Sequence, residues 1–112
     1  MKIAIVGSRS LSNISLEEYL PVNVTEIVSG GAVGVDLCAM QYAKEKGLKL
    51  TEFFPQYERY GRAAPIIRNK AIVAYSDKIL IFWNGNSKGT LSVINLAKKL
   101  RKPYRVILCK EL

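Results

Sequence analysis

The sequence predicts a protein of the α/β class, with one five-stranded, mostly parallel sheet in the strand order 3-2-1-4-5 and helices on both faces. The main observation is that short, β-rich apolar segments alternate with segments of helical periodicity. This alternation is typical of right-handed crossovers between parallel strands. The chain length of 112 residues suits one domain with one core and is too short for two. We therefore predict a single three-layer domain over residues 1–112.

Each predicted strand is a short apolar run rich in β-branched or aromatic residues. Such runs are typical of strands that are buried on both faces of a parallel sheet. The first run ends in Gly7-Ser8, and the second leads into a cluster of glycines, so both are followed by turns. The predicted strands span residues 2–6, 26–28, 48–54, 78–83 and 104–109.

The predicted helices follow from apolar periodicity and from the residues at their ends. Ser15 is expected to cap a short first helix, which Pro21 ends. Pro65 is expected in the first turn of the third helix, and the fourth helix is expected to begin at Thr90. The second, third and fourth helices are predicted over residues 33–46, 65–75 and 90–102, and residues 55–64 are predicted to form an extended loop.

Composition excludes several classes of function. The chain has no histidine, which rules out Ser-His or Cys-His nucleophiles and most zinc sites. Cys38 and Cys109 lie at no metal-ligand or redox spacing, so we expect no metal site and no required cofactor. No apolar run approaches the roughly 20 residues of a membrane helix, and none has the form of a secretory signal. We expect a cytoplasmic protein that has no membrane association.

The charge balance favours anionic partners. The chain carries 17 Lys and Arg against 9 Asp and Glu, which gives a formal net charge of +8. This excess attracts nucleotides or polyanions over about 8–10 Å. An excess of charge also serves solubility, so it does not identify a partner by itself.

The strongest local signal is the segment Ser29-Gly30-Gly31-Ala32-Val33-Gly34-Val35-Asp36, which follows a predicted strand and opens a helix. Its glycines would let backbone N–H groups approach a phosphate, whose charge the helix dipole favours. The alternative is a tight turn without a ligand. Asp36 would either stabilise the first helical turn or accept a hydrogen bond from Ser8, Arg9 or a ribose.

Three further segments are predicted to meet the glycine segment at one edge of the sheet. Arg9 follows the first strand and could hold a phosphate through two hydrogen bonds. Arg68 lies in the third helix, where an ion pair is the alternative role. Thr90 opens the last helix, but its loop does not match the GxxxxGK[ST] pattern of a P-loop. The candidate ligand-binding residues are Gly7, Ser8, Arg9, Ser29, Gly30, Gly31, Gly34, Asp36, Arg68, Asn69, Gly89 and Thr90.

Aromatic residues near these loops have two possible roles. Tyr57, Tyr60 and Trp83 could stack on a nucleic-acid base, or they could belong to the core or its rim. No base-recognition motif accompanies them. The identity of a base is therefore not predicted.

Together these segments resemble the SLOG superfamily of Rossmann-like domains, which includes the Lonely Guy (LOG) phosphoribohydrolases, the DNA-processing protein DprA, and YpsA- and YspA-like proteins. The resemblance extends from Lys2 to about Val106 and is nearest to the small YspA-like branch. It implies a nucleotide-binding, Rossmann-like domain, and it implies a homodimer because such proteins often pair through helices beside the site. The motifs that carry it are Gly7-Ser8-Arg9, residues 29–36, Arg68-Asn69, Ser76-Asp77 and Ser87-Lys88-Gly89-Thr90.

The resemblance leaves three functions open. We favour the binding of a phosphate-bearing nucleotide such as AMP, ADP-ribose or an NAD-like compound, by a sensor, carrier or processing module. DprA-like binding of single-stranded DNA is the alternative, which the positive charge suits. A LOG-type hydrolase is the second alternative. Leu91-Ser92-Val93 follow Gly89-Thr90 where LOG enzymes carry a catalytic glutamate, so such an enzyme would need Asp36 or a carboxylate from a second copy.

Overall fold

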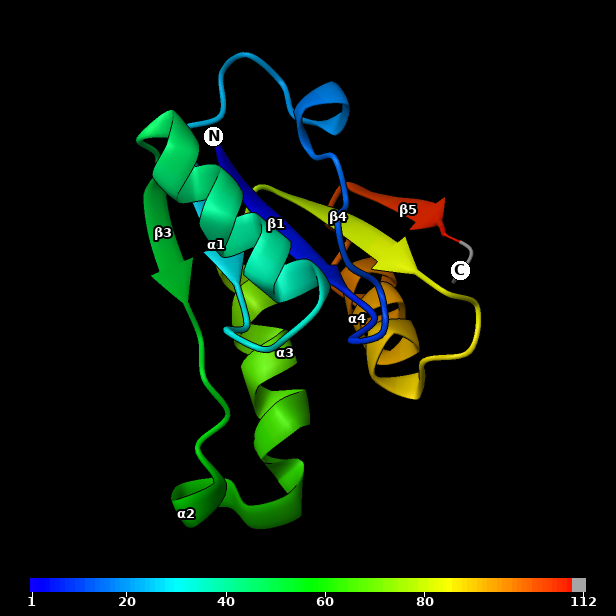
Figure 1. The fold of residues 1–112 in the computed structure, drawn as a ribbon. Coiled ribbons are helices and arrows are strands. Elements are labelled where there is room, and N and C mark those ends of the chain that lie inside the picture. Colours follow the sequence, from blue (N-terminus) through cyan, green and yellow to red (C-terminus); the bar gives the residue numbers. More distant parts are fainter. Residues whose placement is uncertain (110–112) are drawn as a thin grey trace.

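The computed structural model describes residues 1–109 and contains one five-stranded sheet, as predicted (Figure 1). All neighbouring strands pair in parallel, in the order β3-β2-β1-β4-β5. β1 is therefore central, and the predicted Rossmann-like topology is confirmed. The strands are β1 (Lys2–Gly7), β2 (Glu26–Ser29), β3 (Lys49–Glu52), β4 (Lys78–Trp83) and β5 (Tyr104–Leu108).

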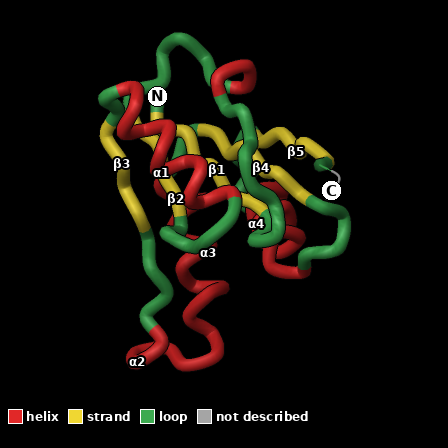
Figure 2. Tube along the Cα trace, in the orientation of Figure 1, coloured by secondary structure: helices red, strands yellow, loops and turns green. Residues whose placement is uncertain are grey.

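Helices cover both faces of the sheet (Figure 2). They divide between the faces because successive residues of a strand point to opposite sides. Ile3 and Ile5 of β1 pack with α1 on one face, whereas Ala4 and Val6 pack with α3 and α4 on the other. The helices are α1 (Val35–Lys46), α2 (Tyr57–Tyr60), α3 (Ala64–Tyr75) and α4 (Lys88–Lys99), with 3₁₀ turns η1 (Glu17–Tyr19) and η2 (Gly61–Ala63).

The predicted first helix is wrong. The chain between β1 and β2 forms only the 3₁₀ turn η1, which Leu16 precedes without any capping hydrogen bond from a side chain. Too few residues separate Ser15 from Pro21 for helical hydrogen bonds to repay the cost of nucleation. The segment contributes to the core instead, because Leu11 and Leu16 are 4% and 3% exposed against the α1 face of the sheet.

The prediction of an extended loop over residues 55–64 is wrong from Tyr57 onward, because α2, η2 and the first residue of α3 lie there. The Gln56 carbonyl accepts hydrogen bonds from the amides of Arg59 and Tyr60, which close the single turn α2. Gly61, with φ of +56°, ends that turn and leads into η2. These local hydrogen bonds place the aromatic residues of this segment beside the start of α3.

A buried carboxylate joins β2, β3 and α3 away from the glycine segment. Glu26 is 7% exposed and accepts hydrogen bonds from the Thr51 hydroxyl at 2.6 Å and the Tyr75 hydroxyl at 2.5 Å. The Lys49 ammonium lies 3.8 Å from the other carboxylate oxygen. Burial acts to raise the pKa of Glu26, but the two hydrogen bonds and the lysine charges hold the pKa below its ordinary value of 4.5.

Replacing Glu26 with glutamine is expected to destabilise the domain by about 1–3 kcal/mol at neutral pH, because charge-assisted hydrogen bonds are lost. The folded-state pKa is depressed, so the advantage of the wild type is complete above pH 4.5 and is lost as the pH falls through the folded-state pKa. Urea unfolding between about pH 6 and about pH 3 measures this difference. The exposed Glu18→Gln is the control, and a pH-independent difference between wild type and Glu26→Gln would contradict the prediction.

Candidate functional site

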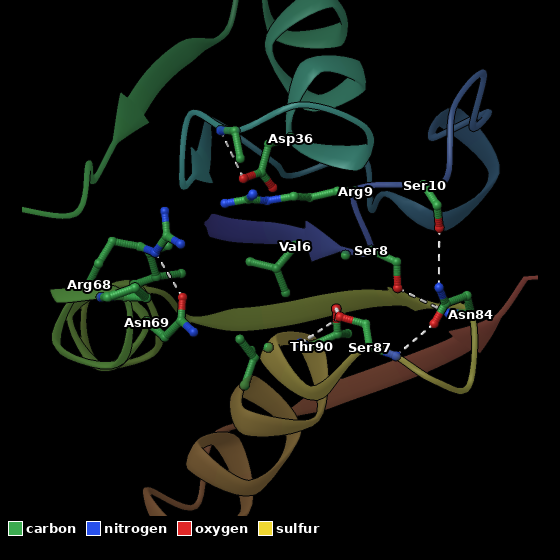
Figure 3. A pocket seen from close by; sticks show the side chains of 16 residues that line it. Val6, Ser8, Arg9, Ser10, Asp36, Arg68, Asn69, Asn84, Ser87 and Thr90 are labelled. Atoms are coloured by element: carbon green, nitrogen blue, oxygen red, sulfur yellow. Dashed lines mark hydrogen bonds between the residues drawn. The ribbon is translucent and has the colours of Figure 1, made fainter. Parts of the chain in front are cut away.

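A polar cleft of about 450 Å³ opens at the carboxyl ends of β1 and β4 (Figure 3). The loops after β1, β2 and β4 meet there, and α3 closes one side. This is the location that parallel α/β sheets use for ligands. Eight of the twelve candidate residues line the cleft, namely Gly7, Ser8, Arg9, Asp36, Arg68, Asn69, Gly89 and Thr90.

Two guanidinium groups belong to this cleft. Figure 3 shows the Arg9 side chain extending beneath Asp36 toward the side of the cleft that holds Arg68. Within residues 1–109, the ion pairs shorter than 4.0 Å are Lys46–Glu17 and Lys49–Glu26, so neither guanidinium is in one. The two positive charges repel each other, and an anion between them would relieve this repulsion.

Arg68 is held in place by its neighbours. Its Nη1 donates a hydrogen bond of 2.9 Å to the Gly30 carbonyl, and its Nε donates one of 2.8 Å to the Asn69 amide oxygen. Asn69 is 8% exposed, so the group that orients Arg68 is itself fixed by packing. Burial lowers the pKa of Arg68 from its ordinary value, while the nearby Asp36 charge acts in the opposite direction. The guanidinium is therefore pre-oriented, and no group of residues 1–109 is bonded to its Nη2, which can donate to a ligand.

Asp36 shapes the glycine segment. Its carboxylate accepts a hydrogen bond of 3.1 Å from the Ala32 amide, which closes the turn at the start of α1. The residue is 7% exposed, and burial raises the pKa of its carboxyl even though the Ala32 amide and the charges of Arg68 and Arg9 act to lower it. Both roles expected for Asp36 are compatible with this position, because it supports the turn and also lines the cleft.

The four candidate residues that do not line the cleft are Ser29, Gly30, Gly31 and Gly34. The three glycines among them have no side chain, so other groups can approach their backbone closely. A Cβ at Gly30 would lie 2.6 Å from Arg68 Nη1, and one at Gly34 would lie 2.5 Å from the Arg9 carbonyl. The Ser29 hydroxyl accepts a hydrogen bond from the Gly31 amide at 3.4 Å, within the turn. Gly30 and Gly34 thus leave room for the Arg68 side chain and for the backbone of Arg9.

The loop after β4 supplies groups that were not among the candidates. Ser87 caps α4, and its hydroxyl accepts hydrogen bonds from the Thr90 amide at 3.3 Å and the Thr90 hydroxyl at 3.0 Å. The helix therefore begins at Lys88 and not at the predicted Thr90. The capping preference of serine for the amide three residues later could have revealed this start. Of the residues absent from the candidates, Ser10, Ala32, Asn84 and Ser87 line the cleft together with four apolar neighbours.

A chain of hydrogen bonds fixes this loop against β1. The Asn84 amide donates to the Ser8 hydroxyl at 3.2 Å, and the Asn84 side chain accepts from the amides of Asn86 and Ser87, both at 2.9 Å. The indole N–H of Trp83 donates to the Ser87 carbonyl at 3.0 Å. Trp83 therefore serves the loop and the adjoining core, and it does not line the cleft.

The N-terminus of α4 adds positive potential to the cleft. Its 12 residues align their peptide dipoles, and its first turn contains no acidic residue. Gly89 and Thr90, in that first turn, line the cleft. The Thr90 amide is already bound to the Ser87 hydroxyl, but the amides of Lys88 and Gly89 have no acceptor within the helix, so this end of α4 suits an anion.

The comparisons with known proteins concern the first part of the chain. Residues 1–50 match the family model of DNA recombination-mediator protein A. The match includes Arg9, the glycine segment and Asp36, and ends before Arg68. It supports the SLOG/DprA-like superfamily and does not single out the YspA-like branch. No curated protein and no solved structure matches the chain.

The described residues contain neither a metal-binding cluster nor a membrane-spanning helix. In residues 1–109, no three Cys, Asp or Glu side chains gather as ligands for a metal ion. None of the helices in that part of the chain has the length and apolar character that a membrane crossing requires. The prediction of a single domain over residues 1–112 includes residues 110–112, which lie outside the described part.

Proposed function

We propose that the cleft binds the phosphate of a nucleotide or nucleotide derivative, such as AMP, ADP-ribose or an NAD-like compound, as part of a cytoplasmic sensor, carrier or processing module. The observation that carries the proposal is the convergence of Arg9, Arg68 and the N-terminus of α4 on one cleft. Guanidinium groups match phosphate oxygens in pairs, and a helix N-terminus favours the same charge. The cleft also has the size of a small-molecule site.

The polar groups around the arginines suit the rest of a nucleotide. The Asp36 carboxylate accepts hydrogen bonds, which fits a ribose hydroxyl better than a phosphate. The Ser8 hydroxyl accepts from Asn84 and retains its own hydrogen as a donor. LOG-type hydrolysis gains no support, because the position after Gly89-Thr90 still lacks a carboxylate and the cleft lining contains no acid besides Asp36.

A ligand panel tests the proposal. Calorimetric titration with AMP, ADP-ribose and ribose 5-phosphate is expected to show one site per chain for each compound. A short DNA oligonucleotide is titrated in parallel, and all titrations are repeated at two salt concentrations. Binding of the small phosphates with a weak dependence on salt is expected, because a mononucleotide displaces few counterions. Tight, salt-sensitive oligonucleotide binding without mononucleotide binding would overturn the proposal.

Single-stranded DNA binding remains the second candidate, and the match to DNA recombination-mediator protein A favours it. The net charge of +8 supports it as well. The lysines of α4 support it less, since Lys98 and Lys99 lie about 15 Å along the helix from Lys88, which is at the cleft end. Lys102 donates to the carbonyls of Ala74 and Ser76, at 3.1 and 2.8 Å, and so has a structural role.

We also propose that the protein forms a homodimer through helices beside the cleft. Leu37 and Leu91, in the first turns of α1 and α4, are 44% and 40% exposed, and covering them would remove apolar surface from water. Light scattering is expected to give twice the chain mass of 12.5 kDa. A species of 12.5 kDa alone, at high protein concentration, would contradict the dimer.

A further inference from the structure

A second cavity, of about 390 Å³, adjoins the phosphate cleft. Arg68 lines both, so one guanidinium separates the two spaces. The extended chain after β3 forms one wall and α3 forms the other, and Figure 1 shows these two segments running side by side down to α2. A ligand that extends past Arg68 would therefore reach this cavity.

The walls of the second cavity are aromatic and apolar. Phe54 and Tyr60 line it and are 60% and 37% exposed, and Ile67 of α3 lies across from them with 38% exposed. Exposed rings of this kind leave apolar area in water that a bound planar group would cover. Of the aromatic residues considered from the sequence, Tyr60 lines this cavity, whereas Tyr57 and Trp83 do not.

The glycine segment holds the Phe54 ring in place. A Cβ at Gly31 would lie 2.2 Å from Cε1 of Phe54, so the ring rests directly on the backbone of Gly31. Because Gly31, with φ of +69°, has no side chain, the Phe54 ring packs against its backbone. The other face of the ring remains exposed. The phosphate cleft and the aromatic platform are in this way built from one turn.

Polar groups at the edge of the cavity suit the rim of a base. The Glu52 carboxylate lines it and accepts hydrogen bonds, and the Gln56 amide both donates and accepts. A nucleobase combines two flat faces that stack with an edge of N–H donors and acceptors. This combination matches the two kinds of group that the cavity presents.

We infer that the second cavity binds the nucleobase of the ligand whose phosphate occupies the first cleft, with the base stacked on Phe54 and Tyr60. The inference rests on the proposed function. It makes Arg68 the element between the phosphate and the base, and it assigns the chain from Glu52 to Tyr60 to base recognition. The base supplies affinity beyond that of the sugar phosphate.

Comparing AMP with ribose 5-phosphate isolates the base. Calorimetry on the wild type is expected to show AMP binding about 10-fold or more tightly than ribose 5-phosphate, the range of one stacked base. Phe54→Ala should remove most of that excess and leave ribose 5-phosphate binding unchanged. Tyr60→Ala is the second variant. It tests the base subsite if the circular dichroism spectrum of Phe54→Ala shows that this variant does not fold. Ile66→Ala is the control, since Ile66 is 59% exposed on the same helix and lines neither cavity.

Several outcomes overturn the inference. Equal affinity of the wild type for AMP and ribose 5-phosphate would contradict a base subsite but would remain consistent with phosphate binding. An equal loss for both ligands in Phe54→Ala does the same. Binding of neither ligand defeats the proposed function together with this subsite. If Phe54→Ala converts a dimer into a monomer and still binds both ligands as the wild type does, the surface around Phe54 contacts a second copy of the chain instead of a base.

Discussion

Replacing Arg68 with alanine is expected to weaken AMP and ribose 5-phosphate binding by about 1.5–3 kcal/mol, or roughly 10- to 150-fold, the scale of a charge-assisted hydrogen bond. The loss is large because Gly30 and Asn69 already hold the guanidinium in position, so its ordering adds little cost on binding. Arg68→Lys should recover only part of the affinity, since an ammonium lacks the planar pair of donors. Calorimetric titration of the three proteins measures these differences.

Two comparisons show whether the effect of Arg68→Ala is specific. Ser92→Ala should bind as the wild type does, because Ser92 lies on α4 outside the cleft lining. Arg9→Ala should produce a loss of similar size to Arg68→Ala, because both charges face the same space. Unchanged ribose 5-phosphate affinity in Arg68→Ala would place the phosphate elsewhere.

Gly34→Ala is expected to destabilise the domain by about 2–4 kcal/mol, from backbone strain and overpacking together. Gly34 precedes α1 with φ of 74° and ψ of −125°, a conformation that side chains rarely adopt. Its added Cβ would also lie 2.5 Å from the Arg9 carbonyl, so relief of the clash must displace Arg9. Urea unfolding measures the stability change. In a titration with AMP, the molecules that remain folded are expected to bind more weakly than the wild type.

Gly89→Ala provides a matched control with the opposite sign. No atom of the described residues lies within 4 Å of a Cβ added at Gly89, and the residue is in the first turn of α4. Alanine there should stabilise the protein by about 0.5–1 kcal/mol, because helical glycine costs backbone entropy. Equal stability changes in Gly34→Ala and Gly89→Ala would show that the turn before α1 tolerates a side chain.

Much of the fold could be predicted because its signals are local. The five apolar runs read as strands buried on both faces, and right-handed crossovers then restrict their order. The two errors in the helices and loops lie where a nearby proline or a local hydrogen bond, and not apolar periodicity, decides the backbone conformation. Ser15 resembles a helix cap, but Pro21 follows too soon for a helix, and the Gln56 carbonyl closes a turn that no apolar periodicity announces.

Only some residues of the candidate site could be located from the sequence. Arg9 and Asp36 could be located because residues after parallel strands meet at one edge of the sheet. Asn84 follows a parallel strand directly, so its loop could be placed at this edge as well. Its contact with Ser10 could not be predicted, since that hydrogen bond of 3.2 Å joins residues that are 74 positions apart. Ser87 is a residue type that favours helix caps, but the prediction began the helix at Thr90 and so missed this cap.

The alternation of strands and helices, the edge of the sheet at which the cleft lies, and the positive charge of the chain follow from residue types and their spacing. The roles of the glycines and the existence of the second cavity do not. Gly30 makes room for Arg68, Gly34 for Arg9, and Gly31 for the Phe54 ring, each through contacts between distant segments. A glycine in the sequence signals only that a side chain is absent. Which group occupies the vacant space is decided by packing, because only the folded chain brings that group within van der Waals distance.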